Sequence, residues 1–323
     1  MLKTITNYTG GLKYENCNCR CWRNGFKIGW HLKKAGNDVI LIDTWDRNIA
    51  AIRENDVVAR VKDEEIAEKM PIYSPEEIDE QHESVDLLIV FTKSMQLENM
   101  LNSLKPIISK DTYVLCLLNG LGHEDVLERF VTRDHIIMGV TMWASMMTAP
   151  GHITFANDNG NVEIQCLDPK GKDETQKIVK ILTDAGLNAS YSENVMYSIW
   201  RKACVNGVVN ALCALLDADC KQFGHTKEAD ELTRNIVQEF ADVAQYEGVN
   251  LDRKEVIEHV ESLFDTPHYP SMHQDLVQNN RPTEIDYIDG AVWRKGLKHS
   301  VATPYCAFIT RLIHAKEDIL NVK

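Results

Sequence analysis

The chain has 323 residues, and its 35 lysines and arginines against 48 aspartates and glutamates give a net charge of −13 with histidine neutral. This length predicts two domains, and the negative charge argues against a nucleic-acid or acidic-membrane partner, because either would be repelled. Nine cysteines without framework spacing fit a reducing cytosol, and no apolar run reaches about 18 residues, so we expect a cytoplasmic protein that does not span a membrane.

The first half of the chain alternates strand-like and helix-like stretches. Its continuous apolar runs are typical of strands buried on both faces of a parallel sheet, and they are Val39–Asp43, Val85–Thr92, Thr112–Leu118 and His135–Met142. Helical patterns at Gln96–Leu104 and Glu124–Phe130 separate them. Shorter strands at His152–Phe155 and Val162–Cys166 and a helix at Glu174–Ala185 follow. This order predicts βαβ units in a doubly wound, Rossmann-type α/β sheet.

The pattern changes from about Asn194. Four segments have helical periodicity and none alternates with period two: Val195–Leu216, Lys227–Glu247, Arg253–Phe264 and Glu284–His299. We therefore expect residues 1–193 to form the α/β domain and residues 194–323 to form an all-helical domain.

One predicted helix, Ile199–Leu216, carries a stripe of polar residues. Lys202, Asn206 and Asn210 lie four residues apart and so share one face, while the rest of the segment is apolar, as in a buried helix. An ammonium group and two amides inside such a helix need partners, because burying them unpaired costs several kcal/mol. The alternative is a solvent-facing stripe on an ordinary amphipathic helix.

Further polar groups follow predicted strands or precede a predicted helix. Lys93 and Gln96 follow one buried strand and Asn119 follows another, at the carboxyl ends where open α/β sheets bind ligands. Glu284 begins the last helical pattern. Each also has a simpler interpretation: a loop lysine, a tight turn at Asn119-Gly120, and a carboxylate that stabilises a first helical turn through the helix dipole.

Five motifs in order, FTKSMQ, LNGLG, IWRKxxxNxxxN, SMxQD and RPTEIDYIDGAV, make the chain resemble the ketopantoate reductase (2-dehydropantoate 2-reductase) family from about Leu32 to Ala315. The resemblance implies a Rossmann-type domain that holds NADPH and a helical domain that closes over it. It implies reduction of a small 2-keto acid, 2-dehydropantoate, to pantoate, a step toward coenzyme A. A homodimer is left open.

The resemblance also implies roles for single residues. Lys202 corresponds to the catalytic lysine and Glu284 to the substrate-binding carboxylate. The positions that would contact substrate are Asn206, Asn210 and Ser271, and those that would lie along the cofactor are Lys93, Gln96 and Asn119. Two positions depart from the family pattern: Tyr269-Pro270-Ser271 replaces an asparagine and a serine pair, and Asp289 replaces an asparagine.

The residue types suit this chemistry. A hydride that arrives at a 2-keto carbon leaves a developing alkoxide, which a positioned ammonium group can stabilise and protonate. A carboxylate can accept a hydrogen bond from the substrate's own hydroxyl, and a buried acceptor left unpaired penalises analogues that lack this hydroxyl.

The glycine-rich phosphate loop of a Rossmann domain is missing from its expected place. Before AGNDVILID stands Asn16–Trp30, NCNCRCWRNGFKIGW, where GxGxxG would let backbone amides approach the pyrophosphate. The C-x-C-x-C spacing of Cys17, Cys19 and Cys21 suggests a metal site, but it is not a usual zinc spacing and no histidine pair follows.

A shift in reading frame accounts better for this segment. Read one base later, the possible codons of residues 16–25 permit I-A-I-A-G-A-G-A-M-G, a strand followed by GxGxxG with glycines at positions 20, 22 and 25. We therefore hypothesise a frameshift in the gene or its sequencing, with the frame restored near residue 31. Because the rest of the sheet leaves room for one strand, we expect strand backbone here in either case.

The choice of cofactor rests on two residues after the next strand. Asp43 stands about 20 residues past the loop position, where an acid usually binds the ribose hydroxyls of NAD. Arg47 could instead serve the 2′-phosphate of NADPH, which the family resemblance implies. Two alternatives stay open: an NADH-dependent reductase of another branched 2-keto acid, and a non-catalytic product whose disrupted loop cannot hold cofactor.

Overall fold

The computed structural model describes residues 17–20, 23–61, 64–79, 82, 84–143, 145–155 and 160–322. Two compact units make up the chain: unit 1 comprises Met1–Leu118 and His123–Val195, and unit 2 comprises Asn119–Gly122 and Met196–Lys323. The sequence had been divided once, between residues 193 and 194. The short segment Asn119–Gly122, expected in the α/β part, groups with the helices instead.

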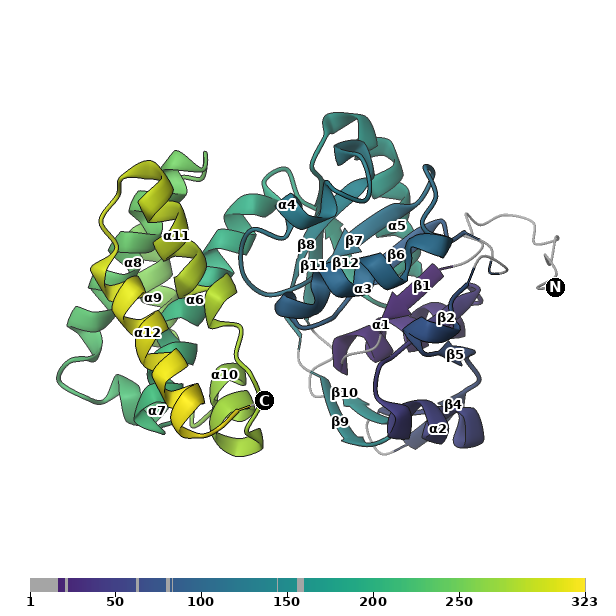
Figure 1. Ribbon diagram of the computed structural model, residues 1–323, viewed down its shortest axis with the longest axis horizontal. Coiled ribbons are helices and arrows are strands. Elements are labelled where there is room, and N and C mark those ends of the chain that lie inside the picture. Colours follow the sequence, from purple (N-terminus) through teal and green to yellow (C-terminus); the bar gives the residue numbers. More distant parts are fainter. Residues whose placement is uncertain are drawn as a thin grey trace. The chain divides into compact units, whose positions relative to one another are not determined.

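Unit 1 is built on an eight-stranded sheet in the order β12-β11-β8-β7-β6-β1-β2-β5 (Figure 1). All neighbouring pairs are parallel except β11 and β8. The strands are β1 (Cys17–Arg20), β2 (Val39–Ile42), β5 (Ile72–Tyr73), β6 (Leu87–Val90), β7 (Tyr113–Cys116), β8 (Ile136–Thr141), β11 (Asn161–Cys166) and β12 (Asn188–Tyr191). All four residues of β6 are buried, as its continuous apolar sequence predicted for a strand covered on both faces.

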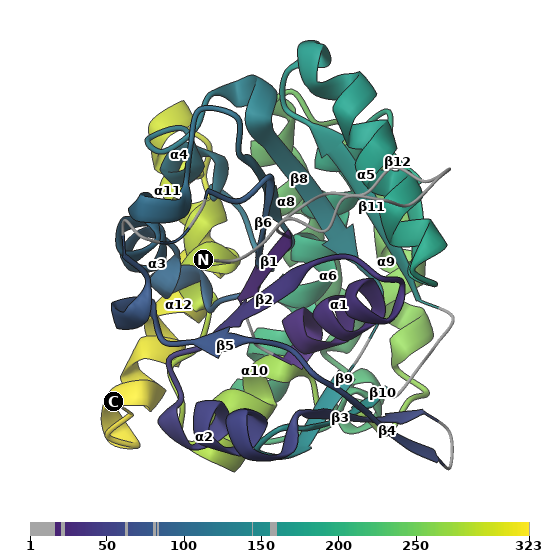
Figure 2. The same ribbon diagram turned by 90° about the vertical axis from the view of Figure 1, so that its right-hand side faces the viewer.

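Strand β1 occupies the place that the rest of the sheet leaves for it. It lies between β6 and β2, with Cys17 opposite both Leu87 and Val39 (Figure 2). The ladder uses only backbone amides and carbonyls, so the strand forms although CNCR is not an apolar sequence. The expectation of strand backbone at this place is confirmed.

Helices cover the sheet of unit 1. They are α1 (Arg23–Lys34), α2 (Asp46–Asn55), α3 (Leu97–Ser103), α4 (Glu124–Leu127) and α5 (Lys172–Asp184), with 3-10 turns at Pro75–Glu77, Ser94–Gln96, Lys105–Ile107, Arg133–His135 and Pro169–Gly171. Figure 2 shows α1 over the β1 and β2 part of the sheet. Phe26 and Leu32 of α1 share one hydrophobic core with Ile178 and Leu182 of α5, so both helices bury their apolar face against the strands.

A second sheet of four strands in the order β4-β3-β10-β9 completes unit 1. Its members are β3 (Val57–Val61), β4 (Glu64–Glu68), β9 (Ser145–Ala149) and β10 (His152–Phe155). Of these, only β10 was predicted. Strand β4, EEIAE, has no buried residue, so its sequence lacks the apolar alternation that identifies a strand.

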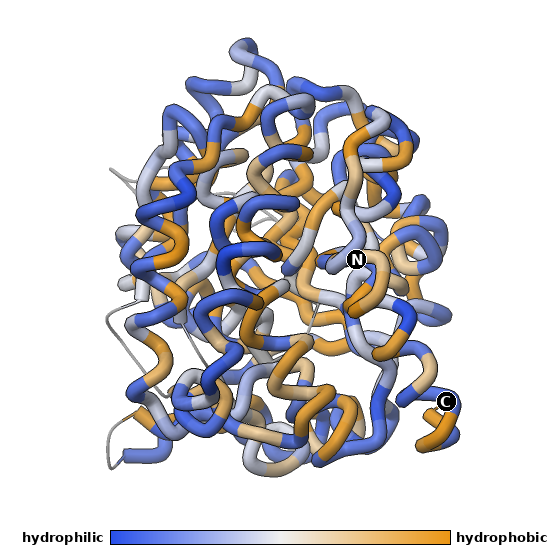
Figure 3. Tube along the Cα trace, turned by 90° about the vertical axis from the view of Figure 1, so that its left-hand side faces the viewer, coloured by the Kyte–Doolittle hydropathy of each residue, from blue (hydrophilic) through white to orange (hydrophobic). Residues whose placement is uncertain are grey.

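In unit 2 every described element is helical, as predicted. The helices are α6 (Val195–Leu216), α7 (Cys220–Gly224), α8 (Ala229–Tyr246), α9 (Arg253–Leu263), α10 (Ser271–His273), α11 (Asp289–His299) and α12 (Pro304–Ile319), with a π-helical segment Gln274–Gln278 and a 3-10 turn Ile285–Tyr287. Apolar and polar stretches alternate along these helices (Figure 3). Helix α6 is long and apolar enough to cross a membrane by length and composition, but 72% of its most apolar window is buried within the structure, as in the core helix of a globular protein.

One predicted helix of this unit was wrong at its start. The pattern Glu284–His299 divides into the 3-10 turn Ile285–Tyr287 and helix α11, which begins only at Asp289. Ile288 breaks the helix with ψ near −100°. Glu284 therefore does not lie in the first turn of an α-helix, and the interpretation of its carboxylate as a partner of the helix dipole falls away.

Candidate active site

The polar stripe of α6 points away from bulk solvent. Asn210 is buried, and Lys202 and Asn206 are half-buried. The rest of α6 is apolar and packed, with Trp200, Cys204 and Val208 almost fully buried. A solvent-facing stripe on an amphipathic helix is therefore not what the structure contains.

Lys202 and Glu284, which are 82 positions apart in the sequence, interact within unit 2. Burial lowers the pKa of Lys202 to about 8, and the carboxylate of Glu284 acts in the opposite direction because it favours the charged ammonium. Glu284 is half-buried and immediately precedes the 3-10 turn Ile285–Tyr287. An ammonium group whose pKa lies near neutrality is poised to give up its proton, which a surface lysine is not.

The two other substrate candidates of this unit also meet. The side-chain amide of Asn210 donates a hydrogen bond to Ser271 Oγ over 3.2 Å. Ser271 is the first residue of α10, and its side chain is exposed apart from this contact. The departure of Tyr269-Pro270-Ser271 from the family pattern thus leaves Ser271 in reach of the stripe on α6.

The segment Asn119–Gly122 packs against the turn that follows Glu284. The backbone amide of Leu121 donates to the carbonyl of Tyr287 over 2.8 Å. Gly120 has φ +98°, and a Cβ atom placed on it would lie only 2.4 Å from the Tyr287 carbonyl oxygen. Gly120 therefore does more than form a tight turn. Because it has no side chain, the segment Asn119–Gly122 can approach the turn after Glu284 closely, and Asn119 directly precedes this contact in the chain.

In unit 1, the cofactor candidates follow adjacent parallel strands. Because β1, β2, β6 and β7 are mutually parallel neighbours, their carboxyl ends share one edge of the sheet. Both candidates follow β6 there: Lys93 is half-buried and directly precedes the 3-10 turn Ser94–Gln96, and Gln96 is exposed and is the last residue of this turn.

Sequence reasoning missed His123, which contacts this turn. His123 is buried, and its Nε2 lies 3.0 Å from Ser94 Oγ. Burial lowers the pKa of His123 to about 4, so the imidazole is neutral at pH 7 and can hold the serine hydroxyl without placing a charge in the interior. Its position directly after LNGLG was the available signal.

Asp43 directly follows β2, and hydrogen bonds fix its carboxylate in place. Oδ1 accepts hydrogen bonds from the backbone amides of Thr44 (2.7 Å) and Trp45 (3.2 Å), and Oδ2 accepts one from the side-chain amide of Asn48 (2.6 Å). Only 7% of Asp43 is exposed. Arg47, in the first turn of α2, is exposed. The structure thus orients an acid, rather than a cation, at the end of β2.

The phosphate-loop position lies only partly within the described residues. Strand β1 ends at Arg20 and α1 begins at Arg23, and residues 21 and 22 of this segment lie outside the described part of the chain. The side chains of Cys17 and Cys19 are likewise not described. No cluster of three metal-ligating side chains occurs among the residues that were searched.

Comparisons with known proteins follow the same division of the chain. A family model described as "Ketopantoate reductase PanE/ApbA" matches residues 25–169, and one described as "Ketopantoate reductase PanE/ApbA C terminal" matches residues 194–317. The first match begins at Gly25, so residues 16–24 of the aberrant segment lie outside it.

Similar sequences and structures cover nearly all of the chain. A 2-dehydropantoate 2-reductase of Lactococcus lactis subsp. lactis is 48% identical over 303 residues, 93% of this chain and 96% of its own. One of Streptococcus pyogenes is 46% identical over 301 residues, with the same shares of the two chains. A structure of D-mandelate dehydrogenase with NADH and anilino(oxo)acetate has a TM-score of 0.91 and 46% identity, and covers 97% of this chain and 100% of its own.

Proposed function

Because the chain belongs to the ketopantoate reductase family and is an oxidoreductase, we propose that it reduces 2-dehydropantoate to pantoate with NADPH, using Lys202 as the general acid. One observation carries this proposal: the ammonium group of Lys202 is withdrawn from solvent, interacts with Glu284, and has a pKa lowered to about 8 by burial. A lowered pKa beside a carboxylate suits a proton donor, because the ammonium group releases its proton more readily.

A bound nicotinamide cofactor would supply the hydride to the 2-keto carbon. Lys202 then neutralises the developing alkoxide and delivers its proton to that oxygen. At pH 7 the ammonium form predominates because its pKa is about 8, and it is a stronger acid than an ordinary lysine, whose pKa is near 10.4. Glu284 keeps Lys202 charged before the reaction.

Glu284 and the α6 amides orient the substrate. A half-buried carboxylate beside the lysine accepts a hydrogen bond from the substrate's hydroxyl, and Asn206 supplies an amide one turn further along α6. Asn210 is already engaged with Ser271 at 3.2 Å, so these two residues together offer a hydroxyl and an amide to the substrate carboxylate.

A nicotinamide cofactor fits the carboxyl edge of β2 and β6 better than it fits the phosphate-loop position. The carboxyl edge of β2 and β6 provides Asp43, Lys93 and Gln96, which would hold the ribose and the adjoining phosphates. Arg20 and Trp22 replace the glycines at which bare backbone would approach the pyrophosphate, and this part does not fit. We therefore assign no role to residues 20–22 in the reaction.

A second function is favoured by Asp43. Its fixed carboxylate suits the 2′-hydroxyl of NADH and repels the 2′-phosphate of NADPH, for which only the exposed Arg47 would compensate. The structure of D-mandelate dehydrogenase at 46% identity was described with NADH. The second candidate is therefore an NADH-dependent reductase of a branched or aromatic 2-keto acid.

Steady-state kinetics with matched compounds separates the two functions. Ketopantoate and 3,3-dimethyl-2-oxobutanoate differ by a single hydroxyl, the group that Glu284 would bind, and each is assayed with NADPH and NADH. A ketopantoate reductase prefers the hydroxylated acid by at least about a hundredfold in kcat/KM, and Glu284→Gln reduces that preference. Equal kcat/KM for the two acids, or higher activity with phenylglyoxylate and NADH, contradicts the first function and supports the second.

A further inference from the structure

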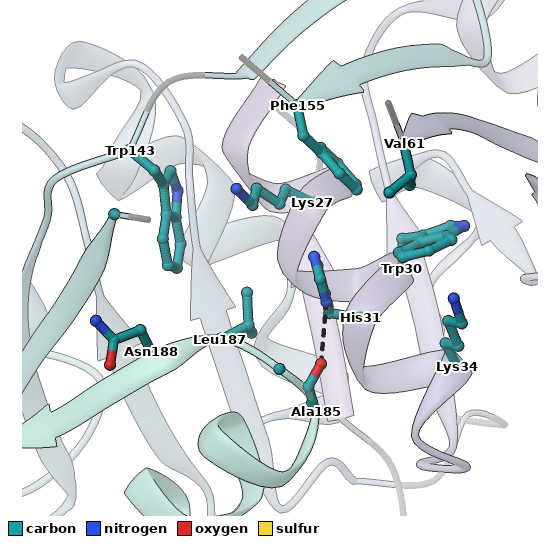
Figure 4. A pocket seen from close by; sticks show the side chains of 12 residues that line it. Lys27, Trp30, His31, Lys34, Val61, Trp143, Phe155, Ala185, Leu187 and Asn188 are labelled. Atoms are coloured by element: carbon teal, nitrogen blue, oxygen red, sulfur yellow. Dashed lines mark hydrogen bonds between the residues drawn. The ribbon is translucent and has the colours of Figure 1, made fainter. Parts of the chain in front are cut away.

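Buried side-chain nitrogens that lack a hydrogen-bond partner among the described residues occur in both units. In unit 1 they include the indole nitrogens of Trp30 and Trp143, which line a cavity of about 240 Å³ (Figure 4). Trp30 belongs to the segment for which we hypothesise a frameshift, so the lining of this cavity is no guide to function. In unit 2 the nitrogen is Nδ1 of His273, which lies in α10, two residues after the substrate candidate Ser271.

His273 contacts the end of α6 through its other ring nitrogen. Nε2 lies 2.8 Å from Oδ1 of Asp217, and because a carboxylate only accepts, Nε2 carries the hydrogen and donates it. Only 2% of His273 is exposed, and its ring lies against that of Tyr269 with 4.3 Å between the centroids. An apolar ring would fill this place without burying an unpaired nitrogen, so packing alone does not account for a histidine here.

Asp217 is also a residue that its local backbone does not favour. It directly follows α6 and has φ +53°, in the left-handed region that favours glycine. The backbone amide of Ala218 donates to the carbonyl of Cys213 over 3.1 Å, a bond that closes helices at a left-handed residue, where glycine is the most common choice. Backbone geometry therefore does not account for an aspartate here, whereas the contact with His273 does.

This contact and the one between Asn210 and Ser271 join α10 to the same side of α6. Asp217 lies seven residues, or about two helical turns, after Asn210. The side-chain amide of Asn210 donates to Ser271 Oγ over 3.2 Å, and His273 contacts Asp217 two residues further along α10. The hydrogen bond of His273 therefore continues the polar stripe of α6 beyond Asn210 and supports the place of Ser271 next to it.

The chain that leads into α10 depends on polar contacts for its position. Residues 265–269 are exposed, so burial in the core does not hold them. The backbone amide of Cys220 donates to the carbonyl of His268 over 3.0 Å, and the side-chain amide of Gln274 donates to the carbonyl of Tyr269 over 2.8 Å. Loss of a side-chain contact at α10 can therefore change where this segment lies.

The hydroxyl of Ser271 becomes a donor for the substrate when it is held against Asn210. A hydroxyl group can accept and donate at the same time, and because Ser271 Oγ accepts from the amide, its own hydrogen is left for an acceptor outside the pair. The carboxylate of a 2-keto acid is such an acceptor, and the bond to it is charge-assisted. A displaced Ser271 removes this donor and leaves Lys202 and Glu284 in place.

We propose that His273 and Asp217 are positioning residues for substrate binding: their hydrogen bond holds Ser271 against Asn210, where its hydroxyl binds the carboxylate of the 2-keto acid. This inference rests on the proposed function and adds to it two residues that touch no reacting atom. Loss of their hydrogen bond should therefore weaken binding of the keto acid and leave the reaction at the 2-keto carbon unchanged.

Steady-state kinetics of matched variants tests the inference in the full chain, with ketopantoate and each cofactor. Asp217→Gly removes the carboxylate where glycine suits the backbone, and His273→Phe keeps a ring and removes the donor. Both should raise KM for the keto acid about fivefold or more, while kcat stays within about twofold. Asp217→Asn keeps an acceptor oxygen and tolerates left-handed backbone, so it should retain the KM of the parent. The control is His268→Gln, at an exposed position of the same segment.

A double-mutant cycle shows whether the pair acts through Ser271. Ser271→Ala should raise KM by itself, and Asp217→Gly should then add less than about twofold. Full additivity of the two substitutions would contradict the proposal. So would a parental KM in both Asp217→Gly and His273→Phe, or a KM of Asp217→Asn as high as that of Asp217→Gly.

The side-chain amide signals of Asn210 in ¹⁵N-labelled protein, identified with Asn210→Asp, give a readout that needs no turnover. Ser271→Ala and Asp217→Gly should both shift these signals, and Asp217→Asn should leave them in place. Unchanged Asn210 signals in Asp217→Gly would overturn the proposal. Absence of turnover of 2-keto acids by the parent contradicts the proposed function instead, and the amide signals then decide whether the pair holds Ser271 against Asn210.

Discussion

The β1–α1 junction of unit 1 and the α6 stripe of unit 2 relate fold to chemistry in opposite ways. At the junction, Cys17–Arg20 forms a parallel strand between β6 and β2 although its sequence is unsuited to the interior of a sheet. On α6, Lys202 and Asn210 occupy positions that cost stability and that the fold does not need. A place in a sheet is filled by backbone hydrogen bonds, whereas a site needs particular atoms at particular residues.

Of the variants that test this comparison, substitution of Lys202 should reduce activity the most. Lys202→Met removes the proton donor but keeps the length of the side chain, and we expect kcat to fall about 10²–10⁴-fold while the melting temperature stays the same or rises. In the unchanged enzyme, the kcat of reduction should fall as the pH rises through about 8, because the ammonium group loses the proton that it donates.

The control for this prediction is Lys227→Met, which removes an exposed lysine of the same unit. It should leave kcat and its pH dependence unchanged. A kcat of Lys202→Met within threefold of that of the parent would remove the general acid from the mechanism.

The next largest effect is expected on cofactor affinity, when the β1–α1 junction is repaired. Replacing residues 16–25 by IAIAGAGAMG restores the glycines at which backbone amides approach the pyrophosphate. We expect the repaired chain to bind NADPH or NADH at least about tenfold more tightly than the chain as written, since each charge-assisted hydrogen bond contributes about 1.5–3 kcal/mol. Titration of cofactor fluorescence measures both affinities.

Equal affinities of the two chains would contradict the argument that side chains at positions 20 and 22 obstruct the cofactor. Resequencing the locus tests the origin of the segment separately, because a clean in-frame read through these codons would end the frameshift hypothesis. Turnover by the chain as written would exclude the non-catalytic alternative.

Gly120 and Gly122 form a matched pair in which only one glycine has a packing role. Both have positive φ, +98° and +88°, but a Cβ atom on Gly120 meets the Tyr287 carbonyl at 2.4 Å whereas one on Gly122 has nothing within 4 Å. Gly122→Ala should cost about 1–2 kcal/mol of backbone strain. Gly120→Ala adds the displacement of the Glu284 turn, so it should lower the melting temperature further and raise KM.

Thermal unfolding and steady-state kinetics of both variants check this prediction. Equal melting temperatures and equal KM values would show that the close approach of Asn119–Gly122 to Tyr287 contributes neither to stability nor to substrate binding.

The smallest effect is expected at Asp289, a buried acid in unit 2. Asp289 has no exposed surface, and neither of its oxygens has a hydrogen-bond partner among the other described residues. Burial raises its pKa well above the ordinary range, and the nearby carboxylate of Glu239 adds to the shift. The folded protein therefore favours the protonated acid, and this contribution to stability is lost as the pH rises from about 4 toward the raised pKa.

Asp289→Asn keeps the shape and removes the ionisation, so its melting temperature should exceed that of the parent by an amount that grows between pH 5 and pH 8, to about 2 °C or more. Asp265→Asn, at an exposed position, is the control and should show no such trend. A difference that is constant with pH would mean that Asp289 does not hold its proton in the folded state.

The sequence predicts an element correctly where its local hydrophobic pattern matches its burial in the fold. Helix α6 has the predicted bounds because its composition requires burial, and β6 was evident from four consecutive apolar residues. Strands β3, β4 and β9 of the second sheet were not predicted, and β4 has no buried residue that would give it an apolar alternation. Helix α12 was not predicted either, although Pro304 at its start and buried residues at 306, 309 and 313 give it a helical pattern.

For the candidate site, the sequence predicted which residues to consider but not their contacts. The spacing on α6 placed Lys202 and the two asparagines on one face, since a helix relates neighbours in the chain directly. The interaction of Lys202 with Glu284, the contact of Asn210 with Ser271 and the approach of Gly120 to Tyr287 join segments 60 or more residues apart. No local pattern encodes such pairs.

The assignment of Asn119–Gly122 to unit 2 has a consequence for dissecting the protein. The polypeptide passes between the units at 118/119, 122/123 and 195/196, so the helical unit is not a contiguous module. A fragment that starts at Met196 would inherit every helix but leave the Tyr287 carbonyl without the amide of Leu121. A chimera of two relatives should therefore take Asn119–Gly122 from the same parent as the helices. Otherwise the tetrapeptide and the Tyr287 turn that it contacts will come from different proteins.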